Sequence, residues 1–540
     1  MTVNLLILLA VSLTLTLRWV WLAGHARILT LTPAFGWLCA GGVTLALPLL
    51  WTPAQQLPVA APRVAALAAG LALLLTGLQL RRRYQTAGLY VILAGVTLQA
   101  LIAVQQLLQH RDAWVPLYGA RAYGSFFQPN VLASFLATGL ALAWALSLLP
   151  HFALPRATAE RRRQGVLFLL IALFSALLVW LQSRVGWLGG LVVTGLFIWR
   201  LGRPFPHRCR QAVFAVGMGT TIGIGVLAFG GGAVVSISHD HSNLARWTML
   251  RDTLAMIGDK PWQGWGYGSF EYAFQHFRIN QTPPTPVTEI ARHPHNELLL
   301  WVVEGGIVAL CGLTLLLAGV IRIVRQALSR DRRAFAVGAP SAGLPTALCI
   351  ALVPIALHTQ LEFPFYLSAA HALTFLFLLA LTDRVGGARG PTLPPRGNRT
   401  LATGMAALAV GGVFITGFAL QGHLALSQVE RFGMEDVTPL QTQPAPARWL
   451  SGERMTFDRQ VNALLTYNHT RDERLLEHYR QWAESYLQQR IDKNVYANLV
   501  LILRHQQRPD DAERYRRDAA RFFPSDERFV PPPPGNREGA

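Results

Sequence analysis

The sequence predicts an all-α protein in which a bundle of about twelve membrane-spanning helices is followed by a small helical domain. Its 540 residues are 52% hydrophobic and only 14% charged, which is too apolar for a soluble chain and excludes a disordered one. Runs such as 59–80, 131–149 and 166–181 are long enough and poor enough in charge to cross a bilayer. After Gln421 the composition changes to mixed charge with helical periodicity.

A hydropathy window of about 19 residues places the individual spans. We expect them near 3–22, 29–51, 60–80, 86–107, 130–149, 165–182, 185–200, 212–235, 297–320, 336–357, 366–382 and 401–420. The first stretch lacks a basic segment before it and contains Arg18, so it is expected to be a span and not a cleaved signal.

Arginine crowds the short gaps between the apolar runs, and such basic loops mark the cytoplasmic side. The basic gaps are 81–83, 156–163, 200–210, 322–333 and 384–399. The loops 108–129, 236–296 and 358–365, with everything after Gln421, are then expected on the outer side of the membrane. The net charge of +19 therefore reflects topology, and no nucleic-acid partner is expected. The four cysteines show no metal-ligand or disulfide spacing, so no metal or cofactor is expected.

These patterns divide the chain into a membrane domain at 1–420, with a large outer loop at 236–296, a helical periplasmic domain at 421–530, and a disordered tail at 531–540. In the second domain, apolar residues of 472–490 follow an i, i+3, i+4, i+7 pattern. Further helices are expected at 494–505 and after Pro509. Three such helices look like a helix-hairpin stack of the tetratricopeptide type.

Four polar clusters lie at the outer ends of the spans, where polar groups are costly and therefore usually functional. In the first, Asn130 can cap the helix that follows, whereas Gln128, an amide beside two phenylalanines, needs a partner. In the second, Arg184 lies between two closely spaced apolar runs. Snorkelling of this arginine to lipid phosphate is the alternative to a functional role.

The third cluster is the long outer loop, which carries Arg246 and ends in His293, His295 and Asn296. A helix start at this point suits an anionic ligand and lowers the pKa of His295, so the imidazole is expected to be neutral. Two histidines alone do not make a metal site. The glycine-x-glycine spacing of this loop follows no strand, so it does not predict a dinucleotide site.

The fourth cluster contains Glu362 and Tyr366 around Pro364. An interfacial tyrosine in an aromatic belt is the alternative for Tyr366. Together the clusters predict a site with two or more arginines, a neutral histidine, an amide and a phenol. The planar fork of arginine suits a diphosphate. Since no nucleotide-binding loop is present, a phosphate-bearing lipid is favoured over ATP.

These residues resemble the O-antigen ligase/polymerase (Wzy/WaaL-like) superfamily. The resemblance rests on the His295-Asn296 step followed by Glu304 and Gly306, and on Ser183-Arg184, Arg246-x-x-Trp and the Pro261 to Phe270 turn. The Gln128-Pro-Asn130 and Glu362-x-Pro364-x-Tyr366 elements, with the helical domain after Gln421, are more similar to protein O-oligosaccharyltransferases of the PglL type.

The resemblance implies a GT-C-like bundle in the bacterial inner membrane that transfers a preassembled oligosaccharide from a polyprenyl (undecaprenyl) diphosphate. The implied acceptors are serine or threonine hydroxyls of periplasmic proteins such as pilins. On this hypothesis His295 accepts the hydroxyl proton, while Arg184 and Arg246 stabilise the leaving diphosphate. Gln128, Asn130, His293, Asn296, Glu362 and Tyr366 complete the predicted substrate-binding set.

Three alternatives remain at this point. An O-antigen ligase would use lipid A-core as acceptor, and an O-antigen polymerase would join repeat units. A transporter also has about twelve spans, but transporters tend to show two related halves and polar groups near the midplane. Here the polar clusters gather at one face and no internal repeat is visible.

Overall fold

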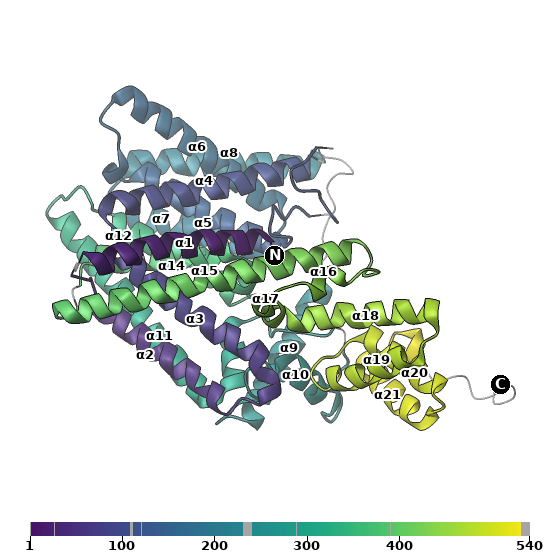
Figure 1. Ribbon diagram of the computed structural model, residues 1–540. Coiled ribbons are helices and arrows are strands. Elements are labelled where there is room, and N and C mark those ends of the chain that lie inside the picture. The colour runs from purple at the N-terminus through teal and green to yellow at the C-terminus, as the bar shows by residue number, and fades with distance from the viewer. Residues whose placement is uncertain are drawn as a thin grey trace.

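The computed structural model describes residues 2–25, 28–108, 112–119, 121–229, 240–287, 289–388 and 390–530. Within these ranges the chain forms helices joined by turns and loops, and no strand. The predicted all-α fold class is therefore confirmed (Figure 1). The tail 531–540, which was expected to be disordered, lies outside the described residues.

The first part of the membrane bundle contains eight helices, all of which coincide with expected spans. They are α1 (Thr2–Gly24), α2 (Pro33–Ala46), α3 (Leu57–Leu78), α4 (Arg82–Leu107), α5 (Pro129–Leu148), α6 (Ala157–Trp180), α7 (Arg184–Leu201) and α8 (Pro206–Phe229). The last expected span of this group, 212–235, extends into residues outside the described ranges. The long outer loop then contains α9 (Asp240–Asp259) and α10 (Phe270–Ile279).

The second part of the bundle completes the membrane domain with α11 (Glu297–Ala336), α12 (Leu344–Thr359), the short α13 (Pro364–Leu367), α14 (Ala369–Gly386) and α15 (Pro395–Arg431). Eleven helices in the described ranges are long and apolar enough to cross a membrane, and α12 is an apolar helix of 16 residues. The expected span 336–357 began too early. Gly343, at a φ of 90°, ends the intervening turn, and α12 starts only at Leu344 with Pro345 in its first turn.

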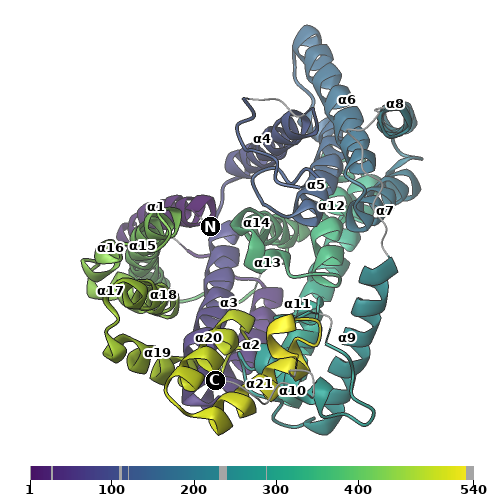
Figure 2. The same ribbon diagram turned by 90° about the vertical axis from the view of Figure 1, so that its right-hand side faces the viewer.

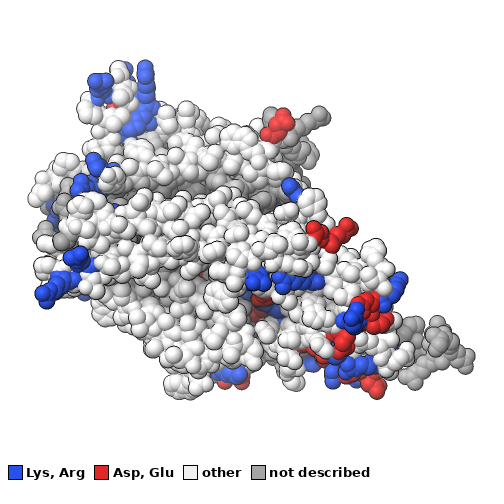
Figure 3. Space-filling view, in the orientation of Figure 1, with Lys and Arg blue, Asp and Glu red and all other residues white. Residues whose placement is uncertain are grey.

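The surface charge agrees with a polytopic membrane protein. On the face shown in Figure 3, lysine and arginine gather at the left-hand end, charges of both signs mix at the right-hand end, and the broad middle surface is uncharged. Because ionised side chains are expensive at membrane depth, such an uncharged belt is typical of the lipid-facing part of a bundle.

The core of the membrane domain lies around α5. Every residue from Val131 to Leu148 is buried, because α4, α6, α7 and α12 all pack against this helix. At the opposite side of the bundle, α1 and α15 lie side by side although they come from the two ends of the membrane domain (Figures 1 and 2). α15 continues through Gln421 to Arg431 without a break, so one helix joins the bundle to the helices that follow.

The C-terminal part contains α16 (Thr438–Gln441), α17 (Ala445–Leu450), α18 (Gly452–Thr470), α19 (Glu473–Tyr486), α20 (Lys493–His505) and α21 (Pro509–Phe522). Leu476 and Tyr479 of the apolar stripe predicted in α19 are buried, at 4% and 1% exposure, and Trp482 and Tyr486 are partly buried. The helices α19–α21 share one hydrophobic cluster with Ile279 and Val287 of the long outer loop. Arg490 reinforces this contact by donating to Glu271 of α10 at 2.9 Å, and Figure 2 shows α10 beside α21.

The longest helix, α11, is broken at Gly306, where φ is 60° and ψ is −150°. This backbone conformation is essentially restricted to glycine. The glycine-rich turn that precedes α10 packs against the break, where the N–H of Trp265 donates to the carbonyl of Val303 at 3.0 Å. The N–H of Gly266 donates to the carbonyl of Glu304 at 2.9 Å. The glycines of this turn therefore allow two backbone segments to approach closely.

We expect Gly306→Ala to destabilise the protein. A Cβ at this position would lie 2.4 Å from the carbonyl oxygen of Trp262, and the backbone strain alone costs on the order of 1–3 kcal/mol. The variant should show a lower unfolding temperature in detergent than the parent. In the control Gly411→Ala, on α15, a Cβ meets nothing within 4 Å, so its unfolding temperature should not fall. An unchanged unfolding temperature for Gly306→Ala would contradict this account of the break.

Candidate functional site

The site is organised around the carboxylate of Glu362, which is 3% exposed in the turn after α12. Its Oε1 accepts hydrogen bonds from Nδ2 of Asn130 at 2.6 Å and from Arg246 at 2.9 Å. Its Oε2 lies 3.2 Å from Nε2 of His358. Burial opposes ionisation, but the bonds from His358 and Asn130 and the charge of Arg246 outweigh it and hold the pKa of Glu362 below its ordinary value. The carboxylate is therefore ionised and joins α5, α9 and α12.

In the first predicted cluster, the residue that caps α5 is not the one that the sequence predicted. Gln128, and not Asn130, is the N-cap of α5, and its side-chain oxygen accepts from the N–H of Asn130 at 3.4 Å. The reason is that Pro129 occupies the first helical position, so the cap falls one residue earlier. The Asn130 amide is thereby left to contact Glu362, and its Oδ1 accepts from the hydroxyl of Ser183 at 2.8 Å.

Arg184 opens α7 directly after Ser183, which caps this helix. Since Ser183 bonds to Asn130 and Asn130 bonds to Glu362, the backbone of Arg184 is fixed at the end of the bundle that carries Glu362. A second arginine, Arg121, lies in the same area and donates to the carbonyl oxygen of Leu181 at 3.2 Å. Arg121 thus bonds to the carbonyl end of the apolar run that precedes Arg184.

His295 lies just before α11, which Asn296 caps by accepting from the N–H of Leu299 at 3.0 Å. Nδ1 of His295 is buried and has no hydrogen-bond partner among the described residues. Buried polar atoms are normally paired, so this nitrogen, free of partners among those residues, is open to a group from outside the chain. Burial first, and then the positive charge of Arg246, lower the pKa of His295, while Glu362 acts in the opposite direction. The structure thus supports the prediction of a neutral imidazole.

His293 is placed differently from His295, among aromatic rings. Its ring stacks on Phe363 with centroids 4.0 Å apart and lies edge-on to Tyr366 at 5.2 Å. Burial lowers the pKa of His293 to about 3, with a smaller contribution from the charge of Arg63. The ring of Tyr366 is 42% exposed, and its hydroxyl bonds to Glu297 at the start of α11. This group of rings forms one wall beside the Glu362 cluster.

A chain of buried polar side chains leads from Glu362 into the bundle. The hydroxyl of Ser134 lies 2.7 Å from Nδ1 of His358 and 3.1 Å from Nε2 of His371. Nδ1 of His371 lies 2.9 Å from the hydroxyl of Ser368. A carboxylate only accepts, so Nε2 of His358 must carry the hydrogen toward Glu362. With both imidazoles neutral, each group of the chain donates its hydrogen to the next one, in the order Ser368, His371, Ser134, His358 and Glu362.

The backbone near the site is strained at three positions. Phe127, Gln182 and His295 have φ angles of 58°, 49° and 51°, a left-handed region that side chains other than glycine rarely adopt. His295 is itself a predicted site residue, Phe127 precedes Gln128, and Gln182 lies two positions before Arg184. Such conformations persist only where the surrounding contacts enforce them, and they concentrate at functional sites. The three predicted segments therefore share a structural property that the sequence did not indicate.

Sequence reasoning missed several residues of this area, above all Arg63. This residue pairs with the buried Glu304, and its guanidinium lies 5.5 Å from the ring centroid of Trp301 and 6.0 Å from that of Tyr366. A charged residue inside the expected span 60–80 was the available signal, because such residues need a partner at membrane depth. The histidines of the buried chain carried a similar signal. For Arg121, the sequence offered no signal except its place in an outer loop.

We expect Glu362→Gln to destabilise the membrane domain. The substitution removes the charge that pairs with Arg246 and turns an amide N–H₂ toward existing donors. Removing one partner of a buried pair costs on the order of 3 kcal/mol, which a shift in the detergent unfolding temperature can detect. Glu435→Gln, an exposed position in the C-terminal part, serves as the control. If both variants unfold together with the parent, Glu362 does not hold these helices.

Comparison with known proteins gives matches to three family models. One for the C-terminal part of virulence factor membrane-bound polymerases matches residues 346–531, one for O-antigen ligases matches 168–317, and one for protein glycosylation ligases matches 122–146. All nine predicted site residues fall within these regions. Arg184, Arg246 and the histidines lie in the O-antigen ligase match.

A similar curated protein is the general O-oligosaccharyltransferase of Acinetobacter baylyi. It is 26% identical over 254 residues, which cover 43% of this chain and 42% of the relative. The match thus spans less than half the length of the relative. Together with the three family matches and the eleven apolar helices, it confirms the resemblance found in the motifs. Over these regions the chain is similar to O-antigen ligases and polymerases and to PglL-like protein glycosylation ligases.

Proposed function

We propose that this protein is a glycosyltransferase that moves a preassembled oligosaccharide from a polyprenyl (undecaprenyl) diphosphate to serine or threonine hydroxyls of periplasmic proteins such as pilins. The proposed location is the bacterial inner membrane, with the site facing the periplasm. The observation that carries the proposal is the placement of a half-buried imidazole of lowered pKa at His295 and the cation Arg246 near one carboxylate, at one end of a membrane bundle. Arg184 is held at the same end through Ser183 and Asn130.

The proposed reaction is a single displacement at the anomeric carbon. The acceptor oxygen forms the new bond to this carbon, while the bond from the carbon to the carrier phosphate oxygen breaks. His295 takes the hydroxyl proton, and the carrier leaves as its diphosphate. Arg184 and Arg246 stabilise the charge that develops on the leaving oxygens, which is the usual task of arginine at phosphoryl groups. No nucleotide is needed, because the diphosphate linkage already supplies the driving energy.

The other predicted residues support these groups. Glu362 is a positioning residue in this proposal, since protein donors occupy both of its oxygens. It orients Arg246 and, through Asn130, the start of α7. Tyr366 and His293 provide an aromatic wall for the substrate, while Gln128 and Asn296 cap the helices that carry the site.

Two features bear on the acceptor. The helices α19–α21 pack on α10 and on Val287 of the outer loop that ends in His295, which places a soluble surface beside the segment that carries the proton acceptor. This favours a protein acceptor, in line with the name of the Acinetobacter relative. The matches named for O-antigen ligases and membrane-bound polymerases favour a second candidate, in which lipid A-core or a growing glycan takes the sugar.

We expect His295→Ala to abolish glycan transfer, because no other neutral imidazole of the site has the same position. The test is to delete the gene, restore it as parent or variant, and compare intact masses of envelope proteins with the lipopolysaccharide ladder. A sugar mass that returns with the parent but not with His295→Ala supports the proposal. The exposed His469→Ala should behave as the parent, and immunoblots of membranes control for insertion.

The same experiment separates the two acceptors. Loss of the sugar mass from a protein with an unchanged ladder selects the protein acceptor, whereas loss of the ladder alone selects the ligase or polymerase. Substantial transfer by His295→Ala would remove this residue as the proton acceptor.

The pH dependence should report the pKa of His295. Burial and Arg246 lower this pKa, and only the neutral imidazole accepts a proton. The acidic limb of kcat/KM is therefore expected below about pH 6.5, the ordinary value for histidine. Arg246→Gln removes one of the lowering causes, so the limb should move to higher pH, whereas Arg246→Lys should leave it in place. Transfer rates in membrane fractions over a pH series measure this, and a limb that does not respond to the charge at position 246 contradicts it.

A further inference from the structure

A cavity of about 480 Å³ opens at the end of the bundle remote from Glu362. It lies between the start of α4, the turn after α5, and the ends of α11 and α14. The helix α14 runs from His371 in the buried chain to Arg384 at the cavity, a rise of roughly 20 Å over this part of a helix. The cavity is thus separate from the candidate glycan-transfer site.

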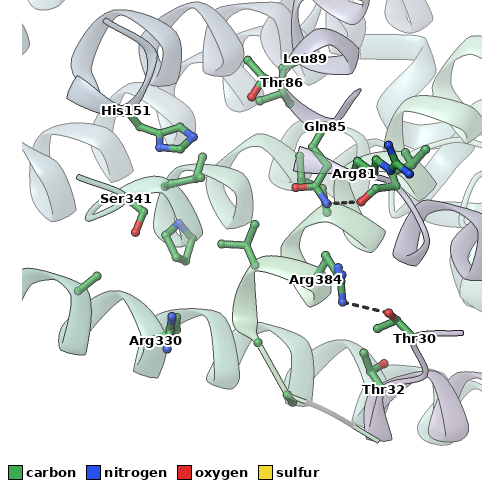
Figure 4. A pocket seen from close by; sticks show the side chains of 18 of the residues that line it. Thr30, Thr32, Arg81, Gln85, Thr86, Leu89, His151, Arg330, Ser341 and Arg384 are labelled. Atoms are coloured by element: carbon green, nitrogen blue, oxygen red, sulfur yellow. Dashed lines mark hydrogen bonds between the residues drawn. The ribbon is translucent and has the colours of Figure 1, made fainter. Parts of the chain in front are cut away.

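Basic side chains from three separate elements surround the cavity, as Figure 4 shows. Arg81 precedes α4, Arg330 lies near the end of α11, and Arg384 lies near the end of α14. His151, in the turn after α5, adds a fourth nitrogen-bearing side chain. None of the lining residues is acidic. The cavity is therefore a region of positive potential between converging helix ends.

Among the described residues, no carboxylate forms an ion pair with Arg81, Arg330 or Arg384. Asp383 accepts a hydrogen bond from Thr32 at 2.5 Å. Asp331 accepts from the N–H of Gly343 at 2.7 Å and from the hydroxyl of Thr346. Arg384 is itself oriented by a hydrogen bond to the hydroxyl of Thr30 at 3.1 Å, drawn in Figure 4. That bond uses one nitrogen of the guanidinium, which has five N–H donors in all.

Part of the lining is apolar, and we call these residues the apolar wall. Leu89 and Leu381 are buried with 3% and 4% exposure, and Phe152 and Leu344 also belong to this part. Thr86 and Ser341 add hydroxyl groups to the lining (Figure 4). A ligand that fits both parts has an anionic head rich in acceptor oxygens and an adjoining hydrocarbon portion.

We propose that this cavity binds the phosphate of an anionic lipid, with the headgroup phosphate between Arg81, Arg330 and Arg384 and the first acyl carbons against the apolar wall. Arginine forks match phosphate oxygens, and basic pockets between transmembrane helices are known to hold lipid headgroups. Snorkelling of single arginines does not require three guanidinium groups from different elements around one cavity. A free phosphate has the same head chemistry but leaves the apolar wall unused.

The test measures binding of dioleoyl phosphatidylglycerol to the purified full-length protein in detergent by native mass spectrometry. Dioleoyl phosphatidylcholine, whose phosphate is neutralised by choline, is the comparison lipid, and inorganic phosphate at constant ionic strength is the competitor. The cavity variant is Arg81→Gln/Arg330→Gln/Arg384→Gln. Its matched control is Arg156→Gln/Arg161→Gln/Arg162→Gln, which removes the same charge from exposed positions around the start of α6, outside the cavity lining.

We expect the parent and the control to prefer phosphatidylglycerol over phosphatidylcholine. The cavity variant should bind phosphatidylglycerol about tenfold more weakly, because it loses several basic contacts to the anionic lipid. Thr86→Trp fills the cavity without changing its charge and should weaken binding in the same way. If the triple variant does not fold, Arg330→Gln alone, at an exposed position of α11, is compared with the parent, and it should show a smaller loss of phosphatidylglycerol binding.

Equal losses in the cavity variant and the control would show that overall charge attracts the lipid, and would overturn the proposal. So would undiminished binding by Thr86→Trp. Full displacement of phosphatidylglycerol by inorganic phosphate, with no preference for the lipid, would assign the site to a free anion and overturn the lipid assignment.

Discussion

The architecture of the site depends on one buried carboxylate. Glu362 must be ionised and fully paired to be tolerated where it lies, and it meets this requirement by drawing donors from α5, α9 and α12 together. Asn130 adds the start of α7 through Ser183. A charge of this kind contributes little net stability against an apolar substitute, but it fixes the relative register of the elements that meet at it. The position of Arg246, and with it the electrostatic field at His295, follows from this pairing.

The bundle separates two ends of different chemistry. At one end, paired charges and imidazoles surround Glu362. At the other end, arginines surround an open cavity whose lining contains no carboxylate. The fully buried α5 and the kinked α11 keep the ends apart. The break at Gly306 lets the glycine-rich turn pack into the helix backbone, so the outer loop is held by main-chain bonds as well as by its own hydrophobic cluster with Leu300 and Val303.

The helices after α15 are part of the same assembly. Their core includes Ile279 and Val287, which belong to the outer loop, and Arg521 donates to Asn280 at 2.7 Å. Because the loop ends in His293 and His295, a change in the docking of these helices acts directly on the segment that carries the imidazoles. The continuous α15 provides a stiff connection to the membrane. The proposed acceptor surface and the proposed proton acceptor are thus mechanically linked.

The sequence by itself determined the helical class, the spans and the stripe of α19, because the length and period of apolar runs are local properties that burial in lipid or in a small core requires. It also indicated the segments of the site, since polar residues at span ends are costly. Only the tertiary structure decided which of their atoms meet. Asn130 and Glu362 are separated by 232 positions, and the pairing of Arg63 with Glu304 joins α3 to α11. The chain through Ser134, His358 and His371 also depends on such long-range contacts, which no local pattern specifies.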